Sequence, residues 1–229
     1  CIAMVVVWSE IAQADREYTA ALVALNSIFQ ILAYGALAYL FVTVLPPLVG
    51  LPGLAVHLTI GQVALNVGLY LGVPFAGGAL TRAVLRPRIG AGAYDNGFVV
   101  RVSPLTLIAL LVTIVAMFSL QGARIAAHPL DVGLVAFPLV IYFVVMFASA
   151  FAMGRGAGAG YERTVSLALT AASNNFELAI AVCVALFGID SGQAFAAVIG
   201  PLIEVPVMLV LVRLALATRA SVFQAEATA

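Results

Sequence analysis

The sequence predicts an all-α protein that crosses a membrane several times, and its composition is the main reason. Of the 229 residues, 64% are hydrophobic and only 9% are charged, whereas soluble domains carry about 25% charged residues. The hydrophobic residues form stretches of about 20, the length that a helix needs to cross a bilayer. This composition makes the lipid bilayer the expected partner. Ten basic residues balance ten acidic ones, so we do not expect the chain to bind nucleic acid.

The order of apolar and polar stretches predicts six full spans and one partial span. Residues 1–12 are too short to span, and we interpret them as the second half of a helix whose first half precedes the sequence. A polar loop is expected at 9–18. The full spans are predicted at 19–44, 51–85, 104–120, 130–153, 165–187 and 194–217, and they are separated by a Gly-rich loop at 89–102, a turn at 122–129, a flexible connector at 154–160 and a tight turn at 188–192.

The arginines predict the orientation. When successive loops are placed alternately on the two sides of the membrane, nine of the ten arginines fall on or near one side and Arg124 falls on the other. By the positive-inside rule the side with nine arginines is cytoplasmic, and so is the C-terminus. We therefore expect a multi-pass protein of the cell membrane. The arginines on the cytoplasmic side are Arg16, Arg82, Arg86, Arg88, Arg101, Arg155, Arg163, Arg213 and Arg219.

The most informative stretch is 170–182, where polar residues interrupt the apolar segment 165–187. Ser173, Asn174, Asn175 and Glu177 stand where hydrocarbon is expected, and an ionisable group at that depth costs about 2.5–3.5 kcal/mol. Adjacent asparagines also disfavour a helix, because their side chains compete for backbone hydrogen bonds. The pattern predicts a broken helix, which in a membrane lines a cavity and marks a transporter's binding site.

The two acids in the apolar spans each allow more than one interpretation. Glu177 is a candidate for proton exchange, because a carboxyl group in apolar surroundings can take up a proton near neutral pH. It is also a candidate Na⁺ ligand together with the asparagine amides, or a structural acid bonded to backbone groups freed by the break. Glu204 lies between Pro201 and Pro206 and is either a second titrating site or a cap for carbonyls that Pro206 releases.

Three further residues are candidates for the same interior. Asn26 and Gln30 are four residues apart and share a helical face, where they line a site or bridge packed helices. Cys1 is a candidate soft ligand for a metal or metalloid, although a lone cysteine in an apolar stretch is also typical of an inert core residue. The sequence lacks the common catalytic motifs, so we do not expect an enzyme.

A faint internal repeat appears when the start of the chain is shifted by 174 residues. Both stretches then read as a half-helix, a short polar loop and a long span with a polar residue near its middle; Gln30 falls on Glu204. The two copies begin on opposite membrane faces, which is typical of inverted-topology transporters.

Several stretches resemble the arsenical-resistance permeases that export arsenite, a branch of the bile acid/sodium symporter superfamily. They are CIAMVVVWS at 1–9, YLGVP at 70–74, MFSLQG at 117–122, SNNFELAIA at 173–181 and AFAAVIGPLIEVP at 194–206. The resemblance implies a ten-span fold of two inverted repeats with two crossing broken helices, of which this chain is the C-terminal part. It divides the chain into 1–50, the end of the first repeat; 51–128, two spans of a panel domain; and 129–229, three core spans.

The resemblance also implies a function, namely proton-coupled efflux of arsenite or antimonite without a cofactor. The family's essential cysteine falls on Cys1, the expected ligand of the trivalent metalloid, and its essential glutamate falls on Glu177. Substrate binding is expected at Cys1, Asn174, Asn175 and Glu177, and ion coupling at Glu177, Asn26, Gln30 and Glu204. The alternatives are a sodium-coupled symporter of organic anions and a structural or sensory subunit.

Overall fold

The computed structural model of the chain describes residues 2–50 and 60–219. Within these residues the regular secondary structure is helical, and five helical segments are long and apolar enough to cross a membrane. The remaining predicted span, 104–120, lies inside α7 (Val99–Ala127), a continuous helix of 29 residues. The predicted fold class, an all-α polytopic membrane protein, is confirmed. The five segments are Arg16–Tyr39, Ala64–Ile89, Pro129–Gly156, Tyr161–Phe187 and Gly192–Thr218.

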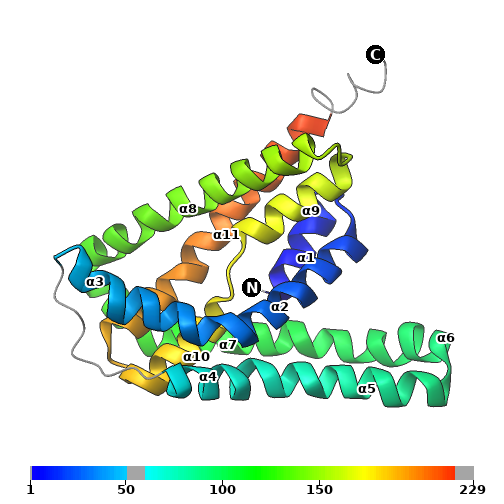
Figure 1. Ribbon diagram of the computed structural model, residues 1–229, viewed down its shortest axis with the longest axis horizontal. Coiled ribbons are helices and arrows are strands. Elements are labelled where there is room, and N and C mark those ends of the chain that lie inside the picture. The colour runs from blue at the N-terminus through cyan, green and yellow to red at the C-terminus, as the bar shows by residue number, and fades with distance from the viewer. Residues whose placement is uncertain (1, 51–59, 220–229) are drawn as a thin grey trace.

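The main hydrophobic core lies between helices from both ends of the chain (Figure 1). It is built from Phe143, Leu169, Met208 and Val212, which are almost fully buried. Because these residues come from three different helices, the core fixes α8 against α9 and α11 and so holds the polar interruption of 170–182 in place. The helices around it are α1 (Ile2–Ile11), α2 (Arg16–Tyr39), α8 (Pro129–Gly156), α9 (Tyr161–Ala172) and α11 (Gly192–Thr218).

The loop between α1 and α2 is shorter than the predicted 9–18, because Asp15 starts the next helix early. The Asp15 carboxylate accepts a hydrogen bond from the Tyr18 backbone N–H at 2.9 Å, which is a standard N-cap. The same turn is tied to α9, where the Tyr161 hydroxyl donates to the Ala12 carbonyl at 2.9 Å. Beyond Tyr39, α2 continues through a π-helical turn (Leu40–Val44) into α3 (Leu45–Leu48).

The second part of the fold is a long hairpin that runs along one side of the molecule in Figure 1. Its first arm is α4 (Ile60–Val67), a π-helical turn (Gly68–Gly72) and α5 (Val73–Ile89); its second arm is α7. The predicted Gly-rich loop at 89–102 is wrong. Only Gly90, with φ of 87°, leaves the helical conformation, and α6 (Ala91–Ala93) and another π-helical turn (Tyr94–Phe98) lead directly into α7.

The predicted turn at 122–129 is also too long, since α7 continues to Ala127 and α8 begins at Pro129. Only His128 separates them, with φ of −124° and ψ of 59°. Proline suits the first turn of α8 because it lacks the N–H that would have no helical partner there. The connector 154–160 and the turn 188–192 are confirmed in outline: α8 ends at Gly156, α9 begins at Tyr161, and α10 (Phe176–Phe187) is followed by α11 from Gly192.

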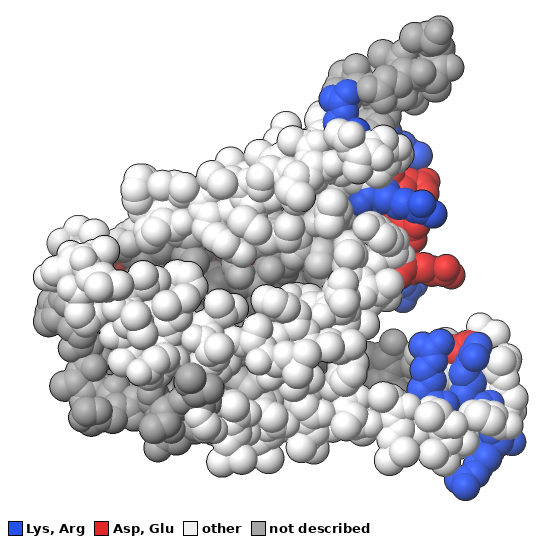
Figure 2. Space-filling view, in the orientation of Figure 1, with Lys and Arg blue, Asp and Glu red and all other residues white. Residues whose placement is uncertain are grey.

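Charged side chains gather at one end of the molecule (Figure 2). The start of α2 and of α9 carry Arg16 and Arg163, and the end of α8 carries Arg155. Arg16 pairs with Glu10 at 3.1 Å and Arg163 with Asp15 at 3.8 Å. These helix ends therefore lie on one side of the membrane-crossing segments, as the alternation of the arginines predicts.

Two polar side chains near the end of α7 hold the turn between α10 and α11. The Gln121 amide donates to the Ile189 carbonyl at 2.7 Å, and the Arg124 guanidinium donates to the Asp190 carbonyl at 2.8 Å. The guanidinium also lies over the Phe195 ring, 4.8 Å from its centroid. The hairpin is thus fastened to the rest of the fold at the end opposite the charged one.

Replacing Gln121 by leucine is expected to lower the free energy of unfolding by about 1–3 kcal/mol. Gln121 is only 4% exposed, so the variant leaves the Ile189 carbonyl without this donor in a place that is poor in water. Thermal unfolding of the purified protein in detergent measures the effect. Leu120→Ala, at the exposed neighbouring position, serves as the control and should change the midpoint little; equal shifts for the two variants would contradict this role of Gln121.

Candidate functional site

The predicted interruption of the helix at 165–187 is confirmed. α9 ends at Ala172 and α10 begins at Phe176, with Ser173, Asn174 and Asn175 between them. Ser173 and Asn175 have extended or non-helical backbone angles, ψ of 146° and 73°. The break frees backbone groups inside an apolar part of the fold, where polar side chains are needed to satisfy them.

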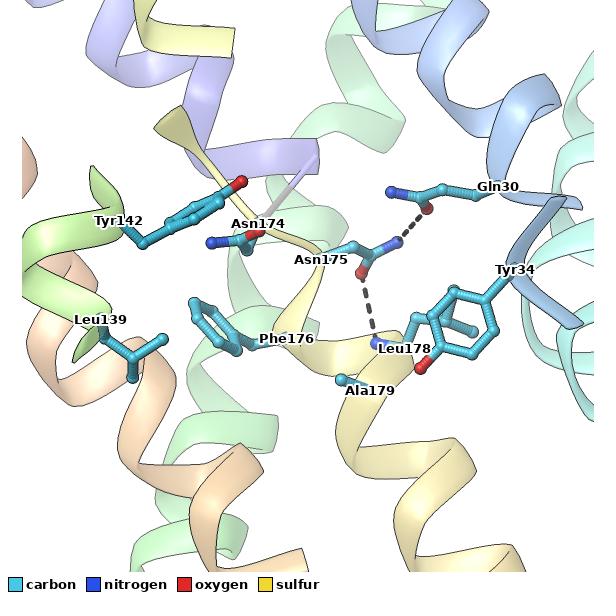
Figure 3. A pocket seen from close by; sticks show the side chains of 9 residues that line it. All are labelled: Gln30, Tyr34, Leu139, Tyr142, Asn174, Asn175, Phe176, Leu178 and Ala179. Carbon is cyan, nitrogen blue, oxygen red and sulfur yellow. Dashed lines mark hydrogen bonds between the residues drawn. The ribbon is translucent and has the colours of Figure 1, made fainter. Parts of the chain in front are cut away.

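Asn175 fixes the start of α10 and joins it to α2 (Figure 3). Its side-chain oxygen accepts a hydrogen bond from the Leu178 backbone N–H at 3.2 Å, which is the N-cap geometry that asparagine favours. Its amide nitrogen donates to the Gln30 side-chain oxygen at 3.1 Å. One side chain therefore caps a half-helix and sets its distance from a neighbouring span.

Ser173 joins the other side of the break to α11. Its hydroxyl donates to a carboxylate oxygen of Glu204 at 2.7 Å. Glu204 is only 3% exposed and lies between two prolines within α11. Glu204, for which the sequence allows either a titrating or a capping role, is thus in direct contact with the break.

Close packing brings α10 and α11 together directly after the break, at the start of α10. Phe176 is 8% exposed and its ring meets that of Phe143 edge to face, with centroids 6.4 Å apart. On the other side the ring lies against Gly200, where an added Cβ would be 2.1 Å from a Phe176 ring carbon. Gly200 is therefore the position that lets the two helices approach this closely.

Two cavities meet at the break. One of about 360 Å³ extends along α10 past Leu178 and Ala179, and one of about 580 Å³ extends along α9 past Leu167 and Thr170. Along α2 the larger cavity is lined from Leu22 to Gln30, whereas the smaller one is lined by Gln30 and Tyr34. The two cavities therefore lie on opposite sides of the break along the helix axes, the larger one toward the charged end. The residues that line both are Gln30, Tyr142, Asn174 and Asn175.

These four residues, which we call the polar collar, come from α2, α8 and the break. Figure 3 shows the Tyr142 hydroxyl beside the Asn174 side chain and the Gln30–Asn175 pair facing them. Between them they offer amide N–H donors, amide carbonyls and a phenol, and none of these groups carries a charge at neutral pH. The arrangement suits a small uncharged solute that both donates and accepts hydrogen bonds.

Three of the seven predicted site residues, Gln30, Asn174 and Asn175, belong to the collar. Asn26 is exposed and lines the larger cavity. α1 also reaches this region through Val5, which lines a pocket of about 20 Å³ with Asn26 and Ser173. Cys1 lies outside the described residues.

Glu177 is half-buried in the first turn of α10 and is not one of the residues that line these three pockets. A carboxylate is favoured at this position by the partial positive charge of a helix N-terminus. Its expected roles in binding and coupling stay predictions.

Tyr142 and Tyr34 are the lining residues that sequence reasoning missed. Tyr142 stands in an apolar span without a polar neighbour, whereas Tyr34 follows Gln30 by four residues and so shares its helical face. A tyrosine near the middle of a predicted span, far from the interfaces that tyrosines favour, was the available signal.

Comparison with known proteins identifies the family of the chain. The sequence model described as the sodium bile acid symporter family matches residues 1–128, more than half of the chain. The chain belongs to this family. Its membership confirms the resemblance stated above, and the family is one of membrane transporters and not of enzymes.

Relatives in the family cover almost the whole chain. An arsenical-resistance protein Acr3 of Corynebacterium glutamicum is 45% identical over 93% of this chain and 57% of its own length. An uncharacterized transporter of Synechocystis is 35% identical over 93% of this chain and 54% of its own length. An arsenical-resistance protein Acr3 of Alkaliphilus metalliredigens is 34% identical over 96% of this chain and 59% of its own length.

The chain thus spans a little more than half the length of these relatives. No solved structure matches the chain.

Proposed function

We propose that this chain is part of a transporter that exports arsenite. The observation that carries the proposal is the 45% identity, over 93% of the chain, to a protein named for arsenical resistance. The matched part of the chain includes the broken helix and the polar collar, which are the features of the fold that can bind a solute. The proposal places the protein in the cell membrane with a cytoplasmic C-terminus.

The chemistry of the collar supports arsenite as the solute. At neutral pH arsenite is the uncharged trihydroxide As(OH)₃, which needs hydrogen-bond partners but no counter-charge. Gln30, Tyr142 and Asn174 offer such partners where the two cavities meet. Cys1, four residues before the pocket-lining Val5 in the sequence, would supply the one sulfur ligand that holds the arsenic: the thiol displaces one hydroxyl group, which leaves with the thiol proton as water. A single thiolate binds less firmly than several, which allows release.

Coupling to protons requires a group whose protonation differs between the inward-open and outward-open states. We propose Glu177 as this group and Glu204 as its partner across the break, with Ser173 linking Glu204 to the binding region. Asn26 and Gln30 would couple solute occupancy to α2. In the same proposal, 1–50 ends a first repeat, 51–128 forms part of a panel domain and 129–229 forms the core domain.

The test follows cellular arsenic in cells that lack their own arsenite exporters and express the protein from its complete reading frame. We expect wild type to keep arsenic low and Cys1→Ser, at equal expression, to accumulate it like cells without the protein. Cys183→Ser is the matched control, because Cys183 lies on α10 and lines neither of the two cavities that meet at the collar, and it should export normally. Accumulation equal to that of empty cells for the wild type would refute arsenite export.

Sodium-coupled symport of organic anions is the second candidate, and the family description favours it. Amide and carboxylate oxygens such as those of Asn174, Asn175 and Glu204 suit a hard cation. Replacing external Na⁺ by choline separates the candidates. Solute movement that stops without Na⁺ supports the symporter, whereas arsenic efflux that continues supports the exporter.

A further inference from the structure

The tip of the α5–α7 hairpin concentrates positive charge. Between residues 73 and 105 the sequence has four arginines, Arg82, Arg86, Arg88 and Arg101, and one acid, Asp95, a net charge of +3 (four minus one). Figure 2 shows basic side chains gathered at the projecting end of the hairpin. An excess of arginine on one side is ordinary in membrane proteins, so charge alone does not define a site here.

A cavity of about 640 Å³ lies beside two of these arginines. Arg82 and Arg86 line it together with the small residues Ala79, Ala83 and Gly90. Positions 79, 82, 83 and 86 follow one face of α5, so the alanines leave a hollow beside the two long side chains. The concave shape and the two cations combine on one helix face.

Arg86 is held in place by one hydrogen bond and has a further N–H group that can donate to a ligand. Arg86 donates from its Nη2 to a carboxylate oxygen of Asp95 at 3.1 Å, which fixes the guanidinium across the turn after Gly90. Its Nε is buried and has no hydrogen-bond partner in the described part of the chain. A buried N–H of this kind normally has a partner, and an anion in the cavity would supply one.

The cavity lies where the hairpin changes from apolar to charged. Leu80 is 65% exposed and Leu105 60% exposed, on the two arms just inside the arginines. Exposed apolar side chains of this length suit the acyl chains of lipids. The boundary between them and the arginines is therefore at the level of the lipid headgroups.

We propose that this cavity binds the phosphate headgroup of an anionic phospholipid in the membrane leaflet on the side of the hairpin tip. Arg82 and Arg86 contact the phosphate, and the exposed leucines contact the acyl chains. The proposal does not depend on the transported solute. It extends the role of the hairpin from crossing the membrane to recognising its lipid.

The test measures lipid binding to the purified complete protein in detergent by native mass spectrometry. We expect phosphatidylglycerol to bind more tightly than phosphatidylcholine. In the double variant Arg82→Gln/Arg86→Gln the affinity for phosphatidylglycerol should fall about 30-fold, since each arginine contributes about 1 kcal/mol to anionic lipid binding. Equal affinity of the wild type for the two lipids would overturn the proposal.

Two further variants separate the site from general charge. Arg155→Gln/Arg213→Gln removes the same charge at exposed positions on α8 and α11 and should leave the affinity within about twofold of wild type; an equal loss in both double variants overturns the site. Ala83→Leu keeps the charge but fills the cavity and should weaken binding as well. Unchanged melting temperatures without lipid show that the variants fold.

Glycerol 3-phosphate distinguishes a lipid from a soluble phosphate. The proposal expects it not to displace phosphatidylglycerol at equal concentration, because it lacks the acyl chains. Displacement at equal concentration would show that the cavity takes a soluble anion, and would overturn the lipid assignment.

Discussion

Gly200→Ala is expected to lower the free energy of unfolding by about 3 kcal/mol, at the upper end of the usual overpacking range. The new Cβ would lie 2.1 Å from a Phe176 ring carbon, whereas carbons in contact are about 3.5 Å apart. Either the ring or α11 has to move by about 1.4 Å. The ring cannot yield easily, because it is buried and also packs against the Phe143 ring. Thermal unfolding in detergent measures the loss.

Two comparisons keep this prediction specific. Gly133→Ala on α8, where a Cβ would meet nothing within 4 Å, should be neutral or stabilising by up to about 1 kcal/mol. In a double-mutant cycle, Phe176→Leu should remove most of the cost of Gly200→Ala, with a coupling of at least about 1 kcal/mol. Additive effects of the two substitutions would show that the ring is not what Gly200 accommodates.

Asn175→Leu is expected to lower both the stability and the rate of arsenic efflux. The variant loses the N-cap of α10, which costs about 1 kcal/mol, and the hydrogen bond to Gln30. If the collar binds the solute, a loss of about 1.4 kcal/mol in positioning corresponds to a tenfold slower efflux. Efflux from loaded cells and unfolding of the purified protein measure the two effects.

A serine at the same position separates capping from the bridge to α2. Asn175→Ser keeps a capping oxygen but its side chain is too short to donate to Gln30. We expect near-normal stability and slow efflux, with Gln30→Met behaving alike. Ser149→Ala, at an exposed position on α8, is the control. Normal efflux in both Asn175→Ser and Gln30→Met would show that the bridge has no part in transport.

The sequence predicted the break because its cause is local. Two adjacent asparagines disfavour a helix in any surroundings, and the structure interrupts the helix at these residues. The spans could be predicted because the thickness of the bilayer sets the length of apolar helix that crosses it. Asn175 and Gln30 were both expected in the interior, but their hydrogen bond joins positions 145 residues apart and is visible only in the fold.

The errors arose where tertiary context decides. Glycines at 92 and 97 suggested a loop, since glycine usually marks turns, yet only Gly90 adopts the positive φ that needs glycine. The remaining glycines stay helical because the hairpin tip keeps its backbone hydrogen bonds within helical turns. Tyr142 reaches the collar through the packing of α8 against α9, which no local pattern indicates.

The division of one span into α9 and α10 has a consequence for biosynthesis. Each half has 12 residues, about 18 Å of helix, and the hydrocarbon core is about 30 Å thick. Neither half can therefore enter the bilayer as a separate segment. The insertion machinery has to accept both halves together with the asparagine pair, and the Asn175 amide finds its partner, Gln30, on α2, which is made earlier. Membrane integration of this segment thus depends on a span already in place, so the order of synthesis is itself part of how the site forms.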